Sequence, residues 1–401
     1  MKIGIISEYY YPYLGGIAEH VHNTWRQFRA RGHDVTIVTP EMKGLRYGAG
    51  VTRGAGWAQE SEIIRIGSSR PFYFNDGFVR LTSPFGLVRR LREVFRSERF
   101  DLVHVHAPLV PMLPMAAIKA ADCPVVGTCH TETSGNTAYR VANVWFWRFA
   151  DRLDGCIAVS PVAAEAMERH FGLSCTIVPN GVDTALYRPG NRPAAGFADG
   201  RRNVLFVGRF DPHNGLKFLL EAFPLVKNQV PDARLVVVGD GPLRKSYERL
   251  VPPSIAGDVH FLGMQYLRKP ELYACADVFV NPALYHAQGI VCLEAMASGT
   301  PIVASAIRGF EWLMQDDAVY AEPGNSAALA SAIIETLSDA NRAADLRRRV
   351  RARAERLSWE VVSGRILDYF GSVIGGTAPD RERSQHAERS VHRQGAPQPV
   401  H

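Results

Sequence analysis

Apolar and polar positions along the chain repeat in the order strand, loop and helix. An apolar run at 2–7 leads through a Gly-Gly pair into a segment whose apolar residues recur every three to four positions, and a second apolar run follows at 35–39. Such spacing predicts an amphipathic helix, and short apolar runs bounded by turn residues predict strands. Further strands are predicted at 102–106, 125–129, 156–160 and 176–178. Strands that alternate with helices are typical of a parallel, doubly wound α/β sheet.

The same order restarts after residues 188–202, which are rich in Pro, Gly and Ala and are predicted to form a linker. A helix is predicted at 216–230. Strands of the second set are predicted at 203–207, 234–238, 259–262, 278–280 and 302–304. The chain is therefore predicted to form two Rossmann-like domains, 1–187 and 203–357, whose parallel sheets face each other across a cleft.

The end of the chain has two different parts. Residues 358–372 have the apolar spacing of a closing helix, which we expect to cross back to the first domain. Residues 373–401 are polar, with almost no large apolar side chain, and we expect a disordered tail there.

The block at 281–305 combines a strand end, a loop with Gly289, a helix and the next strand. The helix is predicted at 291–297. A helix N-terminus that faces a glycine-containing loop at the carboxyl end of a strand is suited to bind an anion. The block therefore predicts a site for a phosphate or another anion.

Charge and composition exclude some function classes. The net charge of +6 comes mostly from arginines in two segments, 83–99 and 341–356. The second segment is typical of a solvated helix face. The second segment has no aromatic residue, the first has only Phe85 and Phe95, and no recognition module is visible, so we expect no nucleic-acid partner.

The cysteines and the start of the chain indicate the compartment. The six cysteines show no metal-ligand spacing, and several lie in apolar runs, so we expect buried, reduced thiols in a cytoplasmic protein. The first ten residues lead directly into a strand, so no signal peptide is expected. No apolar run reaches the roughly 20 residues that span a bilayer.

Six motifs in a fixed order carry a resemblance to a known family. They are YYPYLGGIAEHV near the start, GTCHTE at 127–132, VPNGVD at 178–183, VGRFDPHNG at 207–215, VVGDGP at 237–242 and the block at 281–305. Together they resemble family-four retaining glycosyltransferases of the GT-B fold, over roughly residues 1–372. The first half is most similar to phosphatidylinositol mannosyltransferases, through segments such as PFYFNDGFVRL and DLVHVHAP.

The resemblance implies a hexose-type sugar transferred from a GDP- or UDP-sugar to a lipid or small-molecule acceptor. The diphosphate leaving group must be neutralised, and many such enzymes hold Mg²⁺ with an Asp-x-Asp pair. The chain contains no Asp-x-Asp, so we expect no metal or other cofactor, and positive charge from side chains and helix ends instead. The resemblance assigns the diphosphate to Arg209, Gly15, Gly16, Gly289, Ile290 and Val291.

Two further residues receive roles from the resemblance. Glu294 matches the carboxylate that bonds the ribose of the nucleotide, and His130 matches a histidine beside the sugar and the reacting bond. Retention in this family is described as same-face attack within an ion pair, with the leaving phosphate helping to deprotonate the acceptor. From the residues alone, two alternatives remain. Glu294 could instead complement the dipole of its helix, and His130 could be a structural hydrogen-bonding residue.

The chain departs from the family pattern at two positions. Asn214 stands where the family has a Lys that binds the leaving group, unless His213 or Lys217 substitutes for it. His286 stands where the family has a Glu that contacts the transferred sugar, so charge and hydrogen bonding both change. Either the donor sugar is unusual, or the protein is a catalytically weak or inactive regulator that binds a nucleotide sugar.

The arginines in the first cluster lie on one side of a predicted helix. They are Arg89, Arg90, Arg92, Arg96 and Arg99, and the first four are the candidate membrane or acceptor residues. In phosphatidylinositol mannosyltransferases a basic helix at this place helps the enzyme sit on anionic membrane, which implies a peripheral position on the inner face. The alternative is a surface helix that packs its apolar side on the sheet. One apolar side cannot pack on the sheet and in lipid at once.

Overall fold

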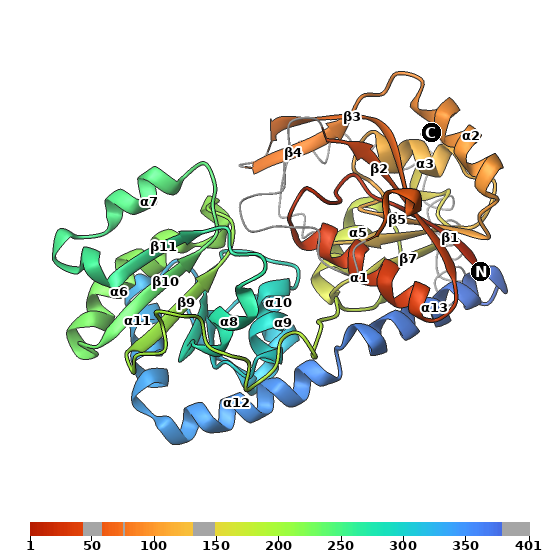
Figure 1. Ribbon diagram of the computed structural model, residues 1–401. Helices are drawn as coiled ribbons and strands as arrows, with labels where there is room; N and C mark the ends of the chain where they lie inside the picture. Colours follow the sequence, from red (N-terminus) through yellow and green to blue (C-terminus); the bar gives the residue numbers. More distant parts are fainter. Residues whose placement is uncertain (43–57, 75–76, 131–148, 379–401) are drawn as a thin grey trace, which may run out of the picture.

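The computed structural model describes residues 1–42, 58–74, 77–130 and 149–378, and the described chain forms two α/β units side by side (Figure 1). Each unit has one sheet with helices on both faces. The α/β class, with two Rossmann-like units built on mostly parallel sheets, is confirmed. Strand and helix bounds agree with the predicted ranges to within a few residues where both exist.

The first sheet has, in the described chain, eight strands in the order β4-β3-β2-β1-β5-β6-β7-β8. Their bounds are Gly77–Thr82, Ile63–Phe74, Asp34–Glu41, Lys2–Ile6, Leu102–His106, Val125–Cys129, Gly155–Ala158 and Thr176–Ile177, in that order. Adjacent strands are parallel except β3 and β4, which form an antiparallel edge pair. The predicted strands did not include β3 and β4.

Helices cover both faces of this sheet. On one face, α1 (Gly16–Ala30) and α13 (Trp359–Ile374) share a core with β1, β5 and β6. On the other face, α2 (Leu87–Glu98) and α3 (Leu113–Ala120) pack over β2 and β5. A further helix, α5 (Pro161–Phe171), is capped at its N-terminus by Ser160, whose hydroxyl accepts from Ala163 N–H. Successive side chains of a strand point to opposite faces of the sheet, so alternate residues of each strand pack in the two different cores.

The second sheet has six parallel strands in the order β11-β10-β9-β12-β13-β14. Their bounds are Val259–Gly263, Ala233–Val238, Arg202–Val207, Val278–Asn281, Ile302–Ser305 and Val319–Ala321. One face carries α8 (Lys269–Ala274), α9 (Ile290–Ala297), α10 (Arg308–Met314) and α12 (Ala340–Glu355). The other carries α6 (Leu216–Gln229), α7 (Arg244–Leu250) and α11 (Ser326–Ser338). The carboxyl ends of all six strands lie at one edge, as a parallel sheet requires.

The chain crosses between the units twice, and the two crossings pair with each other. Val182 and Ser358 form an isolated parallel bridge. Val182 N–H donates to the Leu357 carbonyl at 2.9 Å, and Trp359 N–H donates to the Val182 carbonyl at 3.1 Å. The segment expected to be a linker is packed as well, because Ala194 is fully buried in the second core.

The last described residues belong to the first unit. The ring of Phe370 on α13 lies 5.7 Å from that of Phe28 on α1. The helix extends to Ile374, and Val373 and Ala378 are buried. The expectation of a disordered tail from residue 373 is therefore wrong for 373–378, because Val373 and Ala378 bury apolar surface on the first core. Residues 379–401 lie outside the described chain.

One expectation about the cysteines is also wrong. Cys156 in β7 and Cys175, directly before β8, form a disulfide with a Cα–Cα distance of 4.6 Å. They are 19 positions apart in sequence, and the parallel pairing of β7 with β8 brings them together. Cys123, Cys129, Cys275 and Cys292 are free thiols.

The arginines of α12 are engaged in local contacts. Arg349 and Arg353 pair with Asp317, and Arg351 donates to the carbonyl oxygens of Tyr187 and Ala297. Arg342, Arg348 and Arg349 are exposed, which agrees with the predicted solvated helix face. None of the helices in the described chain combines the length and the apolar content that crossing a bilayer requires.

Candidate active site

Two helices, one from each unit, begin at the boundary between the units. A Cβ added to Gly16, the first residue of α1, would lie 3.4 Å from Ile290 Cδ1 at the start of α9. Neither first turn has a side-chain cap. First-turn amides lack intrahelical acceptors, and the helix dipole adds positive potential there. The fold thus brings together the predicted residues Gly15, Gly16, Gly289, Ile290 and Val291 in an arrangement that can bind one anion from two sides.

Arg209 lies beside this pair of helix starts. It follows β9, and its Nη1 donates to the Tyr13 hydroxyl of the first unit at 3.4 Å. Its Nη2 lies 2.8 Å from the carboxylate of Asp211, which is buried. Tyr13 immediately precedes the loop into α1, so Arg209 adds a fixed positive charge at the anion site. Its partly exposed guanidinium can bind an anion in addition to Asp211.

The two residues that depart from the family pattern contact each other. Asn214 Nδ2 donates to the Arg209 carbonyl oxygen at 3.0 Å, and Asn214 Oδ1 lies 3.2 Å from His286 Nε2. A carbonyl oxygen only accepts, so Asn214 must present its amide nitrogen to Arg209 and its oxygen to His286. His286 Nε2 therefore carries the proton and donates. Burial, with the nearby His213, lowers the pKa of His286 to about 4, so the ring is neutral and its Nδ1 is an acceptor.

Lys217 is placed apart from these residues. It lies on an exposed face of α6, with its Nζ 3.6 Å from Glu221 one turn later. The Glu221 carboxylate in turn accepts from the Ser326 hydroxyl at the start of α11. Lys217 is therefore directed along the outer side of the second unit.

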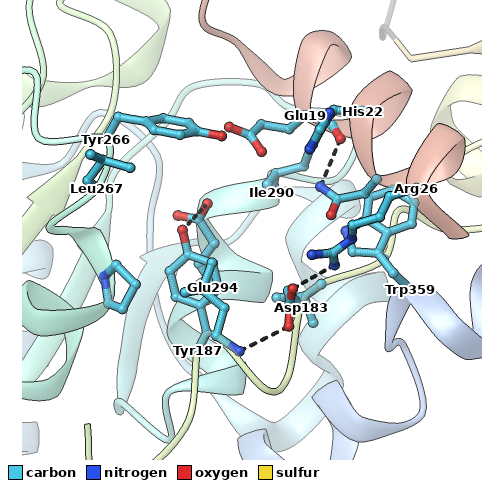
Figure 2. A pocket seen from close by; sticks show the side chains of 15 residues that line it. Glu19, His22, Arg26, Asp183, Tyr187, Tyr266, Leu267, Ile290, Glu294 and Trp359 are labelled. Atoms are coloured by element: carbon cyan, nitrogen blue, oxygen red, sulfur yellow. Dashed lines mark hydrogen bonds and ion pairs between the residues drawn. The ribbon is translucent and has the colours of Figure 1, made fainter. Parts of the chain in front are cut away.

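A cavity of about 240 Å³ lies between the units, with side chains from both (Figure 2). Glu294 on α9 reaches it and is buried. Its Oε1 accepts from the Tyr187 hydroxyl at 3.1 Å and pairs with Lys269, and its Oε2 accepts from the Tyr273 hydroxyl at 3.0 Å. A carboxylate offers about four acceptor positions, so Glu294 retains capacity for ligand hydroxyls.

A second acid lies across this cavity and was not predicted as a site residue. Glu19 on α1 is directed at the Tyr266 hydroxyl (Figure 2). Burial raises the pKa of Glu19, although Lys269 acts against this shift. Burial lowers the pKa of Lys269, but the attraction of Glu294 and Glu19 outweighs it and leaves the pKa raised. The resulting acid–lysine–acid group joins α1 to α8 and α9. Glu19 lies within the quoted motif YYPYLGGIAEHV, whereas Lys269 lies in none of the quoted motifs.

His130 belongs to a cluster of four histidines, of which only His130 was predicted as a site residue. His130 Nε2 lies 2.9 Å from His106 Nδ1, and the rings of His20 and His130 meet edge-on at 4.8 Å. His104 completes the cluster, 4.3 Å from the ring of His106. Burial first, then the neighbouring histidines, hold the pKa of His130 well below its usual range. These rings are therefore neutral near pH 7. His20, His104 and His106 lie within segments quoted for the family resemblance.

Metal-ligand spacing occurs in one group of side chains in the part of the chain that the structure describes. It consists of Cys129, Cys156 and Cys175. Two of these cysteines form the disulfide, so their sulfurs are not available as thiolate ligands.

The predicted basic helix lies away from these residues. Figure 1 shows α2 on the side of the first unit opposite the second unit. Leu87, Leu91 and Phe95 on this helix are buried against the sheet. The apolar side of α2 is therefore occupied by the core and is not available to lipid. Arg89, Arg90, Arg92 and Arg96 are exposed.

The arrangement as a whole is suited to bind a ligand with a central anionic group and a different chemical group on each side of it. The paired helix starts and Arg209 can neutralise a diphosphate. Glu294 lines the cavity between the units, and the histidine cluster with His130 includes His20 of α1. Groups from both units contribute, so the complete site exists only when the units are in contact.

Comparison with known families matches both units. Residues 14–186 match the family described as Glycosyltransferase Family 4. Residues 201–339 match the family described as Glycosyl transferases group 1. The boundary between the two matches falls in the segment that connects the units.

Similar proteins extend over nearly the whole chain. A phosphatidyl-myo-inositol mannosyltransferase of Propionibacterium freudenreichii subsp. shermanii is 31% identical, covering 92% of this chain and 94% of that protein. The enzyme of the same name from Mycolicibacterium smegmatis is also 31% identical, and the match covers 94% of this chain and 95% of that protein. Among solved structures, Anabaena HepE in complex with UDP-glucose superposes with a TM-score of 0.72 and 19% identity, covering 93% of this chain and all of that chain.

Proposed function

The chain belongs to the family-four glycosyltransferases of the GT-B fold, and from this premise we propose that it moves a hexose-type sugar from a nucleotide-diphosphate sugar to an acceptor hydroxyl, with retention and without a metal. The observation that carries this proposal is the meeting of two uncapped helix N-termini, at Gly16 and Ile290, beside Arg209. Fixed dipoles and a guanidinium at a closed interface stabilise a developing diphosphate charge without reorganisation during the reaction.

The nucleoside half of the donor would occupy the cavity between the units. Glu294 faces this cavity and would accept hydrogen bonds from the ribose hydroxyls. Lys269, Tyr187 and Tyr273 hold its carboxylate in one orientation. The names of the relatives favour a mannosyl donor, and the complex of Anabaena HepE with UDP-glucose shows that the fold accommodates a UDP-sugar. Both GDP- and UDP-sugars are therefore candidate donors.

The reaction would break the bond between the anomeric carbon and the β-phosphate oxygen. The bonding electron pair leaves with the diphosphate, which Arg209 and the two helix starts stabilise. The acceptor oxygen attacks the same face of the sugar and passes its proton to the leaving phosphate. In this scheme His130 is neutral and positions a donor hydroxyl beside the reacting bond.

The acceptor side is proposed to be a lipid or small molecule. The relatives with a lipid-type name support a lipid acceptor, since they are similar over both units. The exposed arginines of α2 would hold the protein peripherally on the anionic inner face of the membrane. Because the apolar side of α2 is packed in the core, this attachment would be electrostatic.

A second candidate function is regulation by nucleotide-sugar binding without transfer. The observation that favours it is the presence of Asn214 and His286 at positions where the resemblance implies a Lys and a Glu. A charged donor to a developing anion is worth several kcal/mol of transition-state stabilisation, on the order of 3 kcal/mol for one oxyanion donor. Turnover separates the two functions, because a binding protein releases no diphosphate.

The test is a thermal-shift panel of GDP- and UDP-sugars, followed by a transfer assay in excess EDTA. A donor at 100 times its dissociation constant should stabilise the fold by about 2.7 kcal/mol. We expect the stabilising donor to be turned over in EDTA with retention at the anomeric carbon. Restoration of activity by Mg²⁺ or Mn²⁺ after chelation would contradict the metal-free scheme. Binding without any turnover would support the second candidate.

A further inference from the structure

Asn180 of the first unit and Gln288 of the second are joined by two hydrogen bonds. The backbone N–H and the Nδ2 of Asn180 both donate to Gln288 Oε1, at 2.8 and 2.6 Å. Both side chains are buried, with 5% and 1% exposed. Gln288 stands directly before Gly289, which precedes the first turn of α9, so this contact borders the anion site.

The backbone N–H of Asn180 determines the orientation of the glutamine. A backbone amide only donates, so the Gln288 atom that it contacts must be the carbonyl oxygen. The amide nitrogen of Gln288 therefore points the other way. This nitrogen is buried and has no hydrogen-bond partner among the described residues.

The same reasoning determines the tautomer of His20. The Nδ2 of Asn180 is directed at Gln288, so the Oδ1 accepts from His20 Nδ1 at 2.7 Å, and that nitrogen carries the proton. Burial lowers the pKa of His20 to about 4, so its Nε2 holds a lone pair at neutral pH. This atom is also buried and has no partner in the described chain. His20 lies one helical turn after Gly16, edge-on to His130.

We propose that Gln288 and His20 form a donor–acceptor pair that recognises one hydroxyl of the transferred sugar. The amide nitrogen of Gln288 donates to the hydroxyl oxygen, and the Nε2 of His20 accepts the hydroxyl proton. A buried donor or acceptor without a partner is costly, and a hydroxyl satisfies one of each kind. This assignment rests on the proposed function, since it needs a sugar beside His130.

The pair also links recognition to closure of the two units. Both atoms are buried in the structure, in which Asn180 contacts Gln288. A sugar hydroxyl reaches them only if this contact separates and then re-forms around the donor. Recognition of the correct sugar would then contribute to assembling the complete site.

The first test is Gln288→Glu, assayed between pH 6 and 8. One carboxyl oxygen still accepts from Asn180, but the other donates only when protonated. We expect unchanged affinity for GDP or UDP, at least a tenfold loss in kcat/KM for the nucleotide sugar at pH 8, and partial recovery toward pH 6. The neighbouring His20 and His286 have pKa values of about 4, so they do not titrate in this range. A purely structural contact predicts the opposite slope, because an ionised carboxylate is the better acceptor for Asn180.

The second test uses His20→Asn and a series of monodeoxy analogues of GDP-mannose and UDP-glucose. The asparagine amide can still donate to Asn180, while the Nε2 lone pair is removed. We expect one deoxy analogue to bind at least tenfold more weakly than its parent in the wild type and no more weakly in His20→Asn or Gln288→Glu. If the wild type and both variants discriminate equally between the parent nucleotide sugar and its deoxy analogues, the Gln288–His20 assignment is overturned and the proposed function still stands. If the wild type binds neither GDP, UDP nor their sugars, the proposed function fails and the pair fails with it.

Discussion

The side chains of Asn214 and His286 are hydrogen-bonded to each other, with Nε2 of His286 3.2 Å from Oδ1 of Asn214. The resemblance described above implies a Lys and a Glu at these two positions. Two neutral side chains in contact thus stand where the resemblance implies one cation and one anion, and the summed charge of the pair is the same. The Nδ1 of His286 also remains an acceptor, as the Glu carboxylate would be. The two departures are therefore best understood as one coupled change.

This relationship predicts coupling between His286→Glu and Asn214→Lys. His286→Glu alone adds a negative charge near the diphosphate, and we expect at least a tenfold loss of kcat with a shift in donor preference. Adding Asn214→Lys should restore most of the rate. A double-mutant cycle on kcat/KM should give an interaction free energy of roughly 0.5–3 kcal/mol. Strictly additive effects would show that the two side chains act independently.

Arg209→Ala is expected to lower kcat/KM by about 10²–10³, or roughly 2.7–4 kcal/mol, because a charged donor to the leaving diphosphate is lost. Binding of the nucleoside diphosphate should weaken far more than binding of the bare nucleoside. Arg202→Ala is a matched control, since Arg202 lies at the other end of β9 with its own ion pair to Asp277 at 3.7 Å. The thermal stability of both variants should be measured, because Asp211 loses its partner. Equal diphosphate affinity in wild type and Arg209→Ala would remove Arg209 from the site.

Membrane attachment through α2 is expected to be electrostatic and sensitive to salt. Replacing Arg92 and Arg96 by Gln should weaken binding to vesicles with anionic phospholipid by about 2 kcal/mol, at about 1 kcal/mol per residue. The charge-matched control replaces Arg342 and Arg348 on α12, and it should bind as the wild type does. Vesicle co-sedimentation at low and high salt measures both. Binding that survives 1 M salt would point to an apolar anchor instead.

Glu8 should make the free energy of unfolding depend on pH. Burial raises the pKa of Glu8 to about 7, although the hydroxyls of Thr82 and Ser69 donate to it. Between its unfolded value of 4.5 and this folded value, the folded chain keeps a proton that the unfolded chain releases. The stability contributed by this proton is complete below pH 4.5 and is lost as pH rises through 7, by at most about 3 kcal/mol.

Glu8→Gln should therefore be more stable than the wild type at pH 8 and similar to it at pH 4.5. Urea unfolding at several pH values measures the difference. Glu168→Gln on α5 replaces an exposed acid and is the control. Parallel stability curves for wild type and Glu8→Gln would show that Glu8 does not hold its proton in the folded chain.

The order of elements and the family could be predicted because both are local properties of the sequence. Periodicity of apolar residues is set by the geometry of single helices and strands, so the helix predicted at 291–297 is found at Ile290–Ala297. The same reasoning identified the apolar side of α2, which includes Leu87, Leu91 and Phe95. It could not tell whether that side meets the sheet or lipid, because either would satisfy the pattern.

Only the tertiary structure decided which residues are partners. Asn214 and His286 are 72 residues apart, and Asn180 and Gln288 are 108 apart in different units. Cys156 and Cys175 meet because two parallel strands pair. Such contacts depend on strand order and on how the two units pack. Neither property produces a periodic pattern of residues along the chain. The sequence by itself determined the fold class and the residue types available for chemistry, whereas long-range packing decided their hydrogen bonds, protonation and charge.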